Sequence, residues 1–73
     1  MMNRITKKDI KLDKVYTVEA HINDEIRDYG NMTGADVLAV IGTAKFDEEM
    51  NKEFGVNMFC TAKANKVYFI EEA

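Results

Sequence analysis

The sequence predicts an α+β fold, in which helices pack on one face of a small three-stranded antiparallel sheet. Three features predict this fold. Residues 15–22 alternate between apolar and polar side chains, residues 33–44 begin with a helix cap, and residues 56–71 contain two β-rich runs joined by a short turn. A chain of 73 residues builds one modest core, so we expect a single domain over residues 1–73.

The N-terminal part is expected to form a helical turn and then a strand. Thr6 and Asp9 have the spacing of a capping box, which predicts a brief helical turn before Ile10 and Leu12. The alternation in residues 15–22 predicts a strand with one buried face. The side chains expected on that face are Tyr16, Val18, Ala20 and Ile22.

A second helical turn is expected directly after this strand. Asn23 is a common helix-capping residue, and Ile26 and Tyr29 follow at the spacing of one helical face. Gly30 suits the left-handed conformation that ends a helix. We therefore expect Ile26 and Tyr29 to face inward.

The middle of the chain predicts two further helices, the second of them short. Thr33 and Asp36 have capping-box spacing and precede apolar residues at helical intervals. The alternative for residues 37–42 is a buried strand, because this run is compact, β-branched and bounded by glycine. The cap chemistry favours the helix. Asp47 then begins a further helix through Phe54, which Gly55 ends.

The C-terminal part predicts a hairpin of residues 56–62 and 66–71, with a turn at Lys63-Ala64-Asn65. Its alternation places Phe59, Tyr68 and Ile70 on the open side of the sheet, as a candidate partner surface. The alternative is that the N-terminal segment covers some of these side chains. The expected core comprises Tyr16, Val18, Ile22, Val37, Val40, Ile41, Phe54, Met58, Val67 and Phe69.

Charge is distributed unevenly along the chain. The net charge is −3, residues 1–14 are basic and residues 15–55 are acidic. An acidic middle repels phosphate backbones and favours a basic protein partner. The candidate acidic contacts are Asp47, Glu48 and Glu49, and the candidate basic contacts are Lys7 and Lys8.

No constellation of residues predicts catalysis or cofactor binding. His21 and Cys60 are the single histidine and cysteine, too few for a zinc site. The expected strand phases point them to opposite faces, which argues against a nucleophile–base pair. Residues 42–45 lack the length and the Gly-Lys-Ser/Thr ending of a phosphate-binding loop. We therefore expect no metal, no cofactor and no enzymatic activity.

Composition also predicts the cellular setting. One cysteine forms no internal disulfide, and no apolar run approaches the roughly 18 residues that cross a bilayer. We expect a cytoplasmic protein that does not contact membranes, present as a monomer or weak dimer.

In its size, acidity and simple α+β layout, the chain resembles small bacteriophage-encoded takeover proteins, which inhibit host RNA polymerase or other nucleic-acid machinery. The resemblance implies a regulator that docks on a larger protein, with RNA polymerase as the partner, and that inhibits or redirects transcription. The alternative is a small nucleic-acid-binding module that uses the basic N-terminal arm, including Lys7, Lys8 and Lys11, together with the sheet aromatics.

Overall fold

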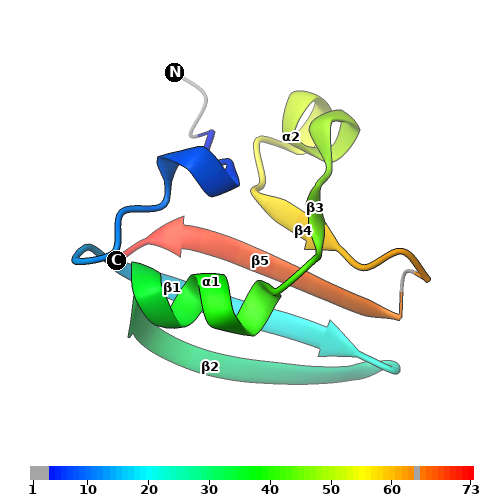
Figure 1. Cartoon of the computed structure of the whole chain (residues 1–73). Helices are drawn as coiled ribbons and strands as arrows, with labels where there is room; N and C mark the ends of the chain where they lie inside the picture. The colour runs from blue at the N-terminus through cyan, green and yellow to red at the C-terminus, as the bar shows by residue number, and fades with distance from the viewer. Residues whose placement is uncertain (1–3, 64) are drawn as a thin grey trace.

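The computed structural model describes residues 4–63 and 65–73. The strands form one antiparallel sheet in the order β2-β1-β5-β4-β3 (Figure 1). The elements in chain order are the 3₁₀-helix η1 (Lys7–Asp9), β1 (Val15–Ile22), β2 (Glu25–Thr33), α1 (Gly34–Ile41), β3 (Lys45–Phe46), α2 (Glu48–Phe54), β4 (Met58–Cys60) and β5 (Lys66–Glu72). The α+β class is confirmed, but the sheet has five strands and the expected three is wrong.

Strand β2 replaces the helical turn expected after residue 22. Asn23 and Asp24 both have positive φ angles, of 50° and 68°, so they form a two-residue hairpin turn rather than a helix cap. The chain then runs back along β1, with Ile22 opposite Glu25. Ile26 is 69% exposed at this edge of the sheet, so the expectation that it faces inward is wrong.

Gly30 lies at a β-bulge in strand β2 and does not end a helix. The register between β1 and β2 shifts after the pair Val18 and Gly30, because Tyr29 is an extra residue on β2. Gly30 has a φ of 67°, and its N–H donates to the Asp28 carboxylate at 2.8 Å. Such a β-bulge bends the strand and interrupts its ladder.

Both predicted helices are confirmed with their caps. The Thr33 hydroxyl accepts a hydrogen bond from the Asp36 N–H before α1, so residues 37–41 are helical and the strand alternative is wrong. The Asp47 carboxylate accepts one from the Met50 N–H at 3.0 Å before α2. Gly55 ends α2 in the left-handed conformation, as expected.

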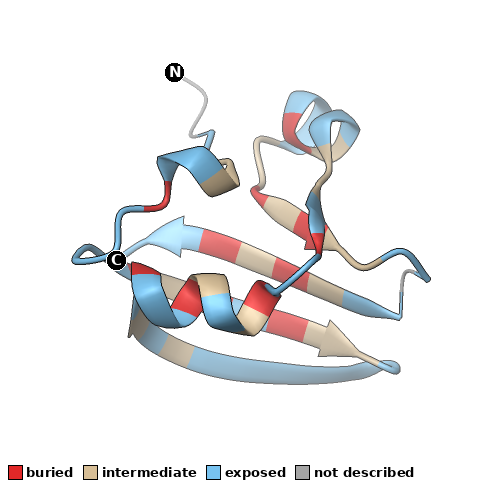
Figure 2. Ribbon diagram, in the orientation of Figure 1, coloured by how far each residue is buried: buried red, intermediate tan, exposed pale blue. Residues whose placement is uncertain are grey.

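The core lies between α1, the N-terminal segment and one face of the sheet (Figures 1 and 2). Cross-strand pairing determines which face each strand contributes. Val18 pairs with Ile70 and Ala20 with Tyr68, and Tyr68 in turn pairs with Phe59. Partners in a ladder point to the same face, so these five side chains share the core.

Several core expectations are therefore wrong. Phe59, Tyr68 and Ile70 are 0%, 5% and 0% exposed, whereas they were expected on the open side. Met58, Val67 and Phe69 are half-buried on the opposite face and lie outside the core cluster. Phe54 is 64% exposed at the end of α2. The remaining expected core residues, Tyr16, Val18, Ile22, Val37, Val40 and Ile41, are buried in the core or packed against it.

The N-terminal segment packs over this core. Cover by this segment is the alternative that the sequence offers to an exposed position for Phe59, Tyr68 and Ile70. Ile5 and Ile10 are buried, whereas Leu12 is 64% exposed. The capping box of Thr6 and Asp9 is present around η1.

Glycine permits close backbone contact between this segment and α1. The N–H of Gly34 donates to the Lys14 carbonyl at 2.8 Å. A Cβ on Gly34 would overlap the carbonyl group of Lys11, whose carbon would be 2.6 Å away. Position 34 is therefore restricted to glycine by the close approach of two backbones.

The predicted C-terminal hairpin is confirmed in its pairing, because Met58 lies opposite Phe69 and Cys60 opposite Val67. Ala64, at the centre of the predicted turn, lies outside the described residues. Thr61 and Lys66 close the loop with a backbone hydrogen bond of 3.1 Å.

Candidate functional site

The candidate site is the sheet face opposite α1 and η1, here called the open face. α1 and η1 lie on the same side of the sheet, and no described helix covers the other side (Figure 1). The alternate residues of each strand supply its side chains. They are Thr17, Glu19 and His21 from β1, Ile26, Asp28 and Asn31 from β2, Lys45 from β3, Met58 and Cys60 from β4, and Val67, Phe69 and Glu71 from β5.

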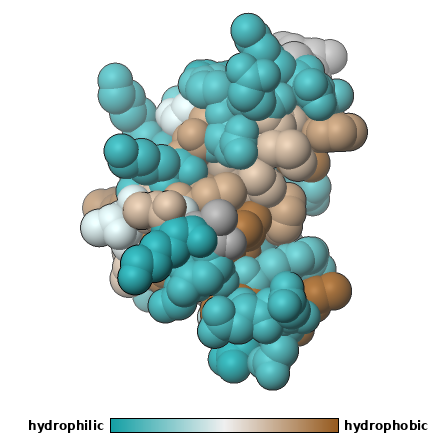
Figure 3. Space-filling view, turned by 90° about the vertical axis from the view of Figure 1, so that its right-hand side faces the viewer, coloured by the Kyte–Doolittle hydropathy of each residue, from teal (hydrophilic) through white to brown (hydrophobic). Residues whose placement is uncertain are grey.

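An apolar strip, made by Met58, Cys60, Val67 and Phe69, crosses the middle of this face. All four side chains are half-buried although no helix covers them, because they pack against one another across β4 and β5. The His21 ring meets the edge of Phe69 at a centroid distance of 5.2 Å and extends the strip onto β1. Seen from the end with the two hairpin turns, hydrophobic atoms gather between hydrophilic regions above and below (Figure 3).

Carboxylates flank the apolar strip on one side. Glu19, Asp28 and Glu71 line a hollow of about 450 Å³, together with Phe69 and Gly30. Gly30 leaves space there because it has no side chain, and a Cβ built on it would meet no atom within 4 Å. No lysine or arginine is among the described residues that line this hollow. The Glu19 carboxylate also lies 3.3 Å from His21 Nε2. The resulting surface joins an aromatic ring to three carboxylates.

The expected acidic residues lie on the other side of the strip. Asp47 caps α2 and Glu48 and Glu49 begin it, and with Lys45 they line a second hollow of about 610 Å³ that reaches Cys60. Glu48 forms an ion pair with Arg4, while Glu49 is exposed. The structure therefore places these carboxylates beside the open face, at its β3 edge.

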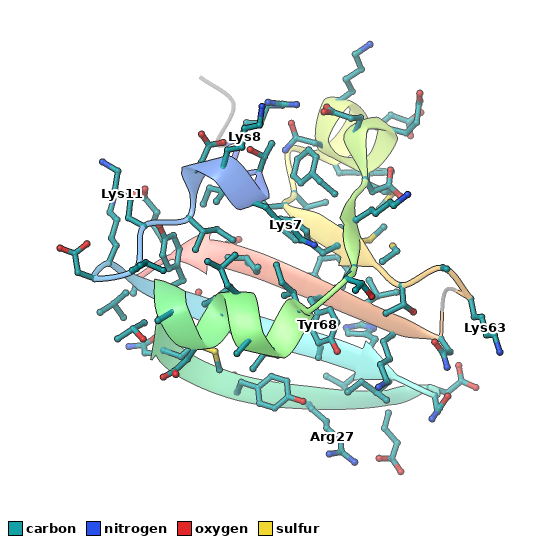
Figure 4. All side chains as sticks on the ribbon, viewed as in Figure 1. Lys7, Lys8, Lys11, Arg27, Lys63 and Tyr68 are labelled. Carbon is teal, nitrogen blue, oxygen red and sulfur yellow. The ribbon has the colours of Figure 1, made fainter. Side chains whose placement is uncertain are left out.

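The expected basic residues lie away from the open face. Lys7 and Lys8 belong to η1, on the covered side of the sheet (Figure 4). The Lys7 ammonium donates to the Gly42 carbonyl at 2.8 Å, whereas Lys8 is exposed. With Arg4 and Lys45 they line a hollow of about 440 Å³ beside Phe46 and Glu48, and the Arg4 guanidinium lies 5.3 Å from the Phe46 ring centre.

His21 and Cys60 share the open face, so the expectation that they point to opposite faces is wrong. Val67 pairs with both residues and separates them. Two strand spacings of about 4.8 Å keep the imidazole and the thiol beyond hydrogen-bond reach. Partial burial, and then the nearby Asp47 carboxylate, raise the pKa of Cys60 above its ordinary value of 9.0. The thiol is therefore protonated at neutral pH.

The residues that sequence reasoning missed are Phe69, Glu19 and Glu71. Glu19 had been placed correctly on the polar side of β1, and its pairing partner is Phe69. The register between β1 and β5 was the missing information, because it brings Phe69 and the two carboxylates together.

Within residues 4–63 and 65–73, no three His, Cys, Asp or Glu side chains are arranged to hold a metal ion. No helix in the described part of the chain has the length and apolar character needed to span a membrane.

Comparison of the chain with protein-family models, with curated proteins and with solved structures gives no match.

Proposed function

We propose that the protein is a non-enzymatic regulator that docks through its open face onto a basic surface of a larger nucleic-acid-handling protein. The resemblance to bacteriophage takeover proteins supplies host RNA polymerase as the candidate partner, and inhibition or redirection of transcription as the effect. The proposal rests on one observation: the half-buried apolar strip lies beside the carboxylates of Glu19, Asp28 and Glu71, and the acidic start of α2 lies beyond Lys45 on its other side.

Charge complementarity supports a basic partner. Interfaces combine an apolar, often aromatic centre with a polar rim, and complementary rim charges guide the encounter. Here Phe69 lies within the face, Glu19, Asp28 and Glu71 flank it, and Asp47 to Glu49 lie beyond Cys60. Protein surfaces that bind nucleic acid carry the matching positive charge.

The experiment measures binding of the purified protein to bacterial RNA polymerase, after nuclease treatment, together with the effect on promoter-dependent transcription. We expect a nuclease-resistant complex at moderate salt and reduced or redirected transcript synthesis. Absence of a complex with both core enzyme and holoenzyme would refute the proposed partner. A complex that disappears with nuclease would refute direct protein docking.

Charge reversal locates the docking surface. The double variant E19K/E71K changes the open face, whereas D13K/E53K makes an equal charge change at two exposed positions outside both carboxylate groups. We expect the first variant to lose binding at least tenfold, which corresponds to about 1.4 kcal/mol, and the second to bind like the wild-type chain. Loss of binding only in the second variant would move the interface away from the open face.

A second candidate function, nucleic-acid binding, is favoured by the hollow that Arg4, Lys7, Lys8 and Lys45 line. It predicts strongly salt-dependent binding of single-stranded DNA or RNA that collapses when Lys7, Lys8 and Lys11 are replaced by glutamine. Retention of binding in E19K/E71K and its loss in this triple variant would favour the second function over the first.

A further inference from the structure

Within the described residues, strand β2 leaves a long edge of the sheet without a neighbour. β2 has nine residues and pairs only with β1, whereas the opposite edge is the two-residue strand β3. Unpaired backbone groups on a long edge form a template for another strand. Ile26, the second residue of β2, is the most exposed large hydrophobic side chain described, at 69%.

The hairpin turn determines which backbone groups are free. Asn23 and Asp24 form a two-residue turn, so Ile22 and Glu25 are its hydrogen-bonded closing pair. Hydrogen-bonding direction alternates along a strand, so Arg27 also faces β1 while Ile26 and Asp28 present their N–H and C=O groups outward. The bulge at Tyr29 and Gly30 ends this regular stretch.

We infer that this edge pairs with the same edge of a second copy of the chain, antiparallel and with Ile26 opposite Ile26. The two Ile26 residues then exchange both backbone hydrogen bonds and place their side chains in contact on the open-face side. The two sheets join into one, with both open faces on the same side, because a two-fold axis perpendicular to the sheet preserves its faces.

The opposite charges of Glu25 and Arg27 favour a second copy in this register. The two residues flank Ile26 in the chain and share the face of β2 opposite to the Ile26 side chain, and their charged groups are 3.6 Å apart within one chain. Centring the pair on Ile26 puts Glu25 of each copy opposite Arg27 of the other. Registers centred on Glu25 or on Arg27 would instead oppose like charges, which is destabilising.

The association is weak. The bulge restricts pairing to residues 25–28, and the same register brings Asp28 near Asp24 of the second copy. A contact this short buries less surface than a stable interface of ordinary size. The dimer therefore forms at high protein concentration.

Sedimentation equilibrium of the full chain, up to millimolar concentration, tests the inference with a charge swap. We expect a monomer–dimer equilibrium for the wild-type chain. Each single variant, E25R or R27E, opposes like charges at both ends of the contact and should raise the dissociation constant about tenfold. The double variant E25R/R27E restores opposite charges, so it should recover wild-type affinity.

Matched controls separate this contact from general charge effects. E53R and K52E make the same charge changes on exposed positions of α2 and should leave the dissociation constant unchanged. Slower amide hydrogen exchange at Ile26 and Asp28 with rising concentration would locate the contact on β2. A wild-type chain that stays monomeric, or a double variant no tighter than the single ones, would overturn the inference.

Discussion

The side chain of Asn57 accepts a hydrogen bond of 2.7 Å from the backbone N–H of Ile5, which lies 52 positions earlier in the chain. The Asn57 side chain also donates to the Ile70 carbonyl at 3.2 Å and accepts from the Asn51 side chain at 3.2 Å. Asn57 is buried and joins the N-terminal segment, α2 and β5.

Replacing Asn57 by alanine should lower the free energy of unfolding by about 1 to 3 kcal/mol, because the Ile5 N–H stays buried without its acceptor. Urea unfolding followed by circular dichroism measures the change. The control N31A alters an exposed asparagine on β2 and should change stability by less than about 0.5 kcal/mol. Equal effects of the two variants would show that the buried network contributes nothing.

Gly34→Ala tests the close approach of α1 to the N-terminal segment. Helix propensity alone predicts that alanine stabilises this position by about 1 kcal/mol. Overlap of the new Cβ with the Lys11 carbonyl predicts a loss of stability instead, because the Cβ is fixed to the helix backbone and the carbonyl belongs to the backbone of the N-terminal segment. We expect a net loss of stability of about 2 kcal/mol or more, as for other strained core positions.

The variant A39G, at an exposed position of the same helix, measures the propensity effect by itself. A gain of stability in Gly34→Ala would contradict the observed packing.

Phe59 and Phe69 test the assignment of the two sheet faces. Phe59 is fully buried and Phe69 half-buried on the open face. Phe59→Ala should lower stability by about 3 to 5 kcal/mol through the cavity it leaves. Phe69→Ala should cost less stability and should weaken partner binding, which thermal unfolding and the polymerase-binding assay measure together. The opposite ranking in stability would reverse the faces.

The Cys60 thiol should react slowly with iodoacetamide at neutral pH. Partial burial raises the pKa of Cys60, so the reactive thiolate becomes populated at a higher pH than in an ordinary cysteine. A pKa raised on folding favours the folded state at low pH, and this contribution disappears as the pH rises through the folded-state pKa. The alkylation rate measured from pH 7 to 11 should therefore rise later than that of a free cysteine peptide. A midpoint below 9.0 would contradict the assigned environment.

The buried face of a strand could be predicted where polar and apolar side chains alternate, and could not be predicted where both faces are apolar. In β1, the polar residues Thr17, Glu19 and His21 alternate with apolar ones, so its buried face was predicted correctly. In β5, Val67 and Phe69 alternate with Tyr68 and Ile70, so both faces are apolar and the strand itself does not distinguish them. Pairing with β1 makes the choice, and that pairing is a long-range property.

The helices were predicted because their signals are local. Caps at Thr33 and Asp47 and the stop at Gly55 act within one helical turn. Asn23 is ambiguous, because asparagine suits both a helix cap and a positive-φ turn. The candidate site could be predicted only in part, since Asp47, Glu48 and Glu49 lie beside the open face but its aromatic residue was assigned to the core.

The position of β1 between β2 and β5 has a consequence for biosynthesis. A growing chain can close the β1–β2 hairpin early, but β5 and Asn57 are translated much later. Until then, the second side of β1 stays unpaired and its apolar face uncovered, the condition in which nascent chains aggregate. Folding therefore finishes only after β5 has left the ribosome.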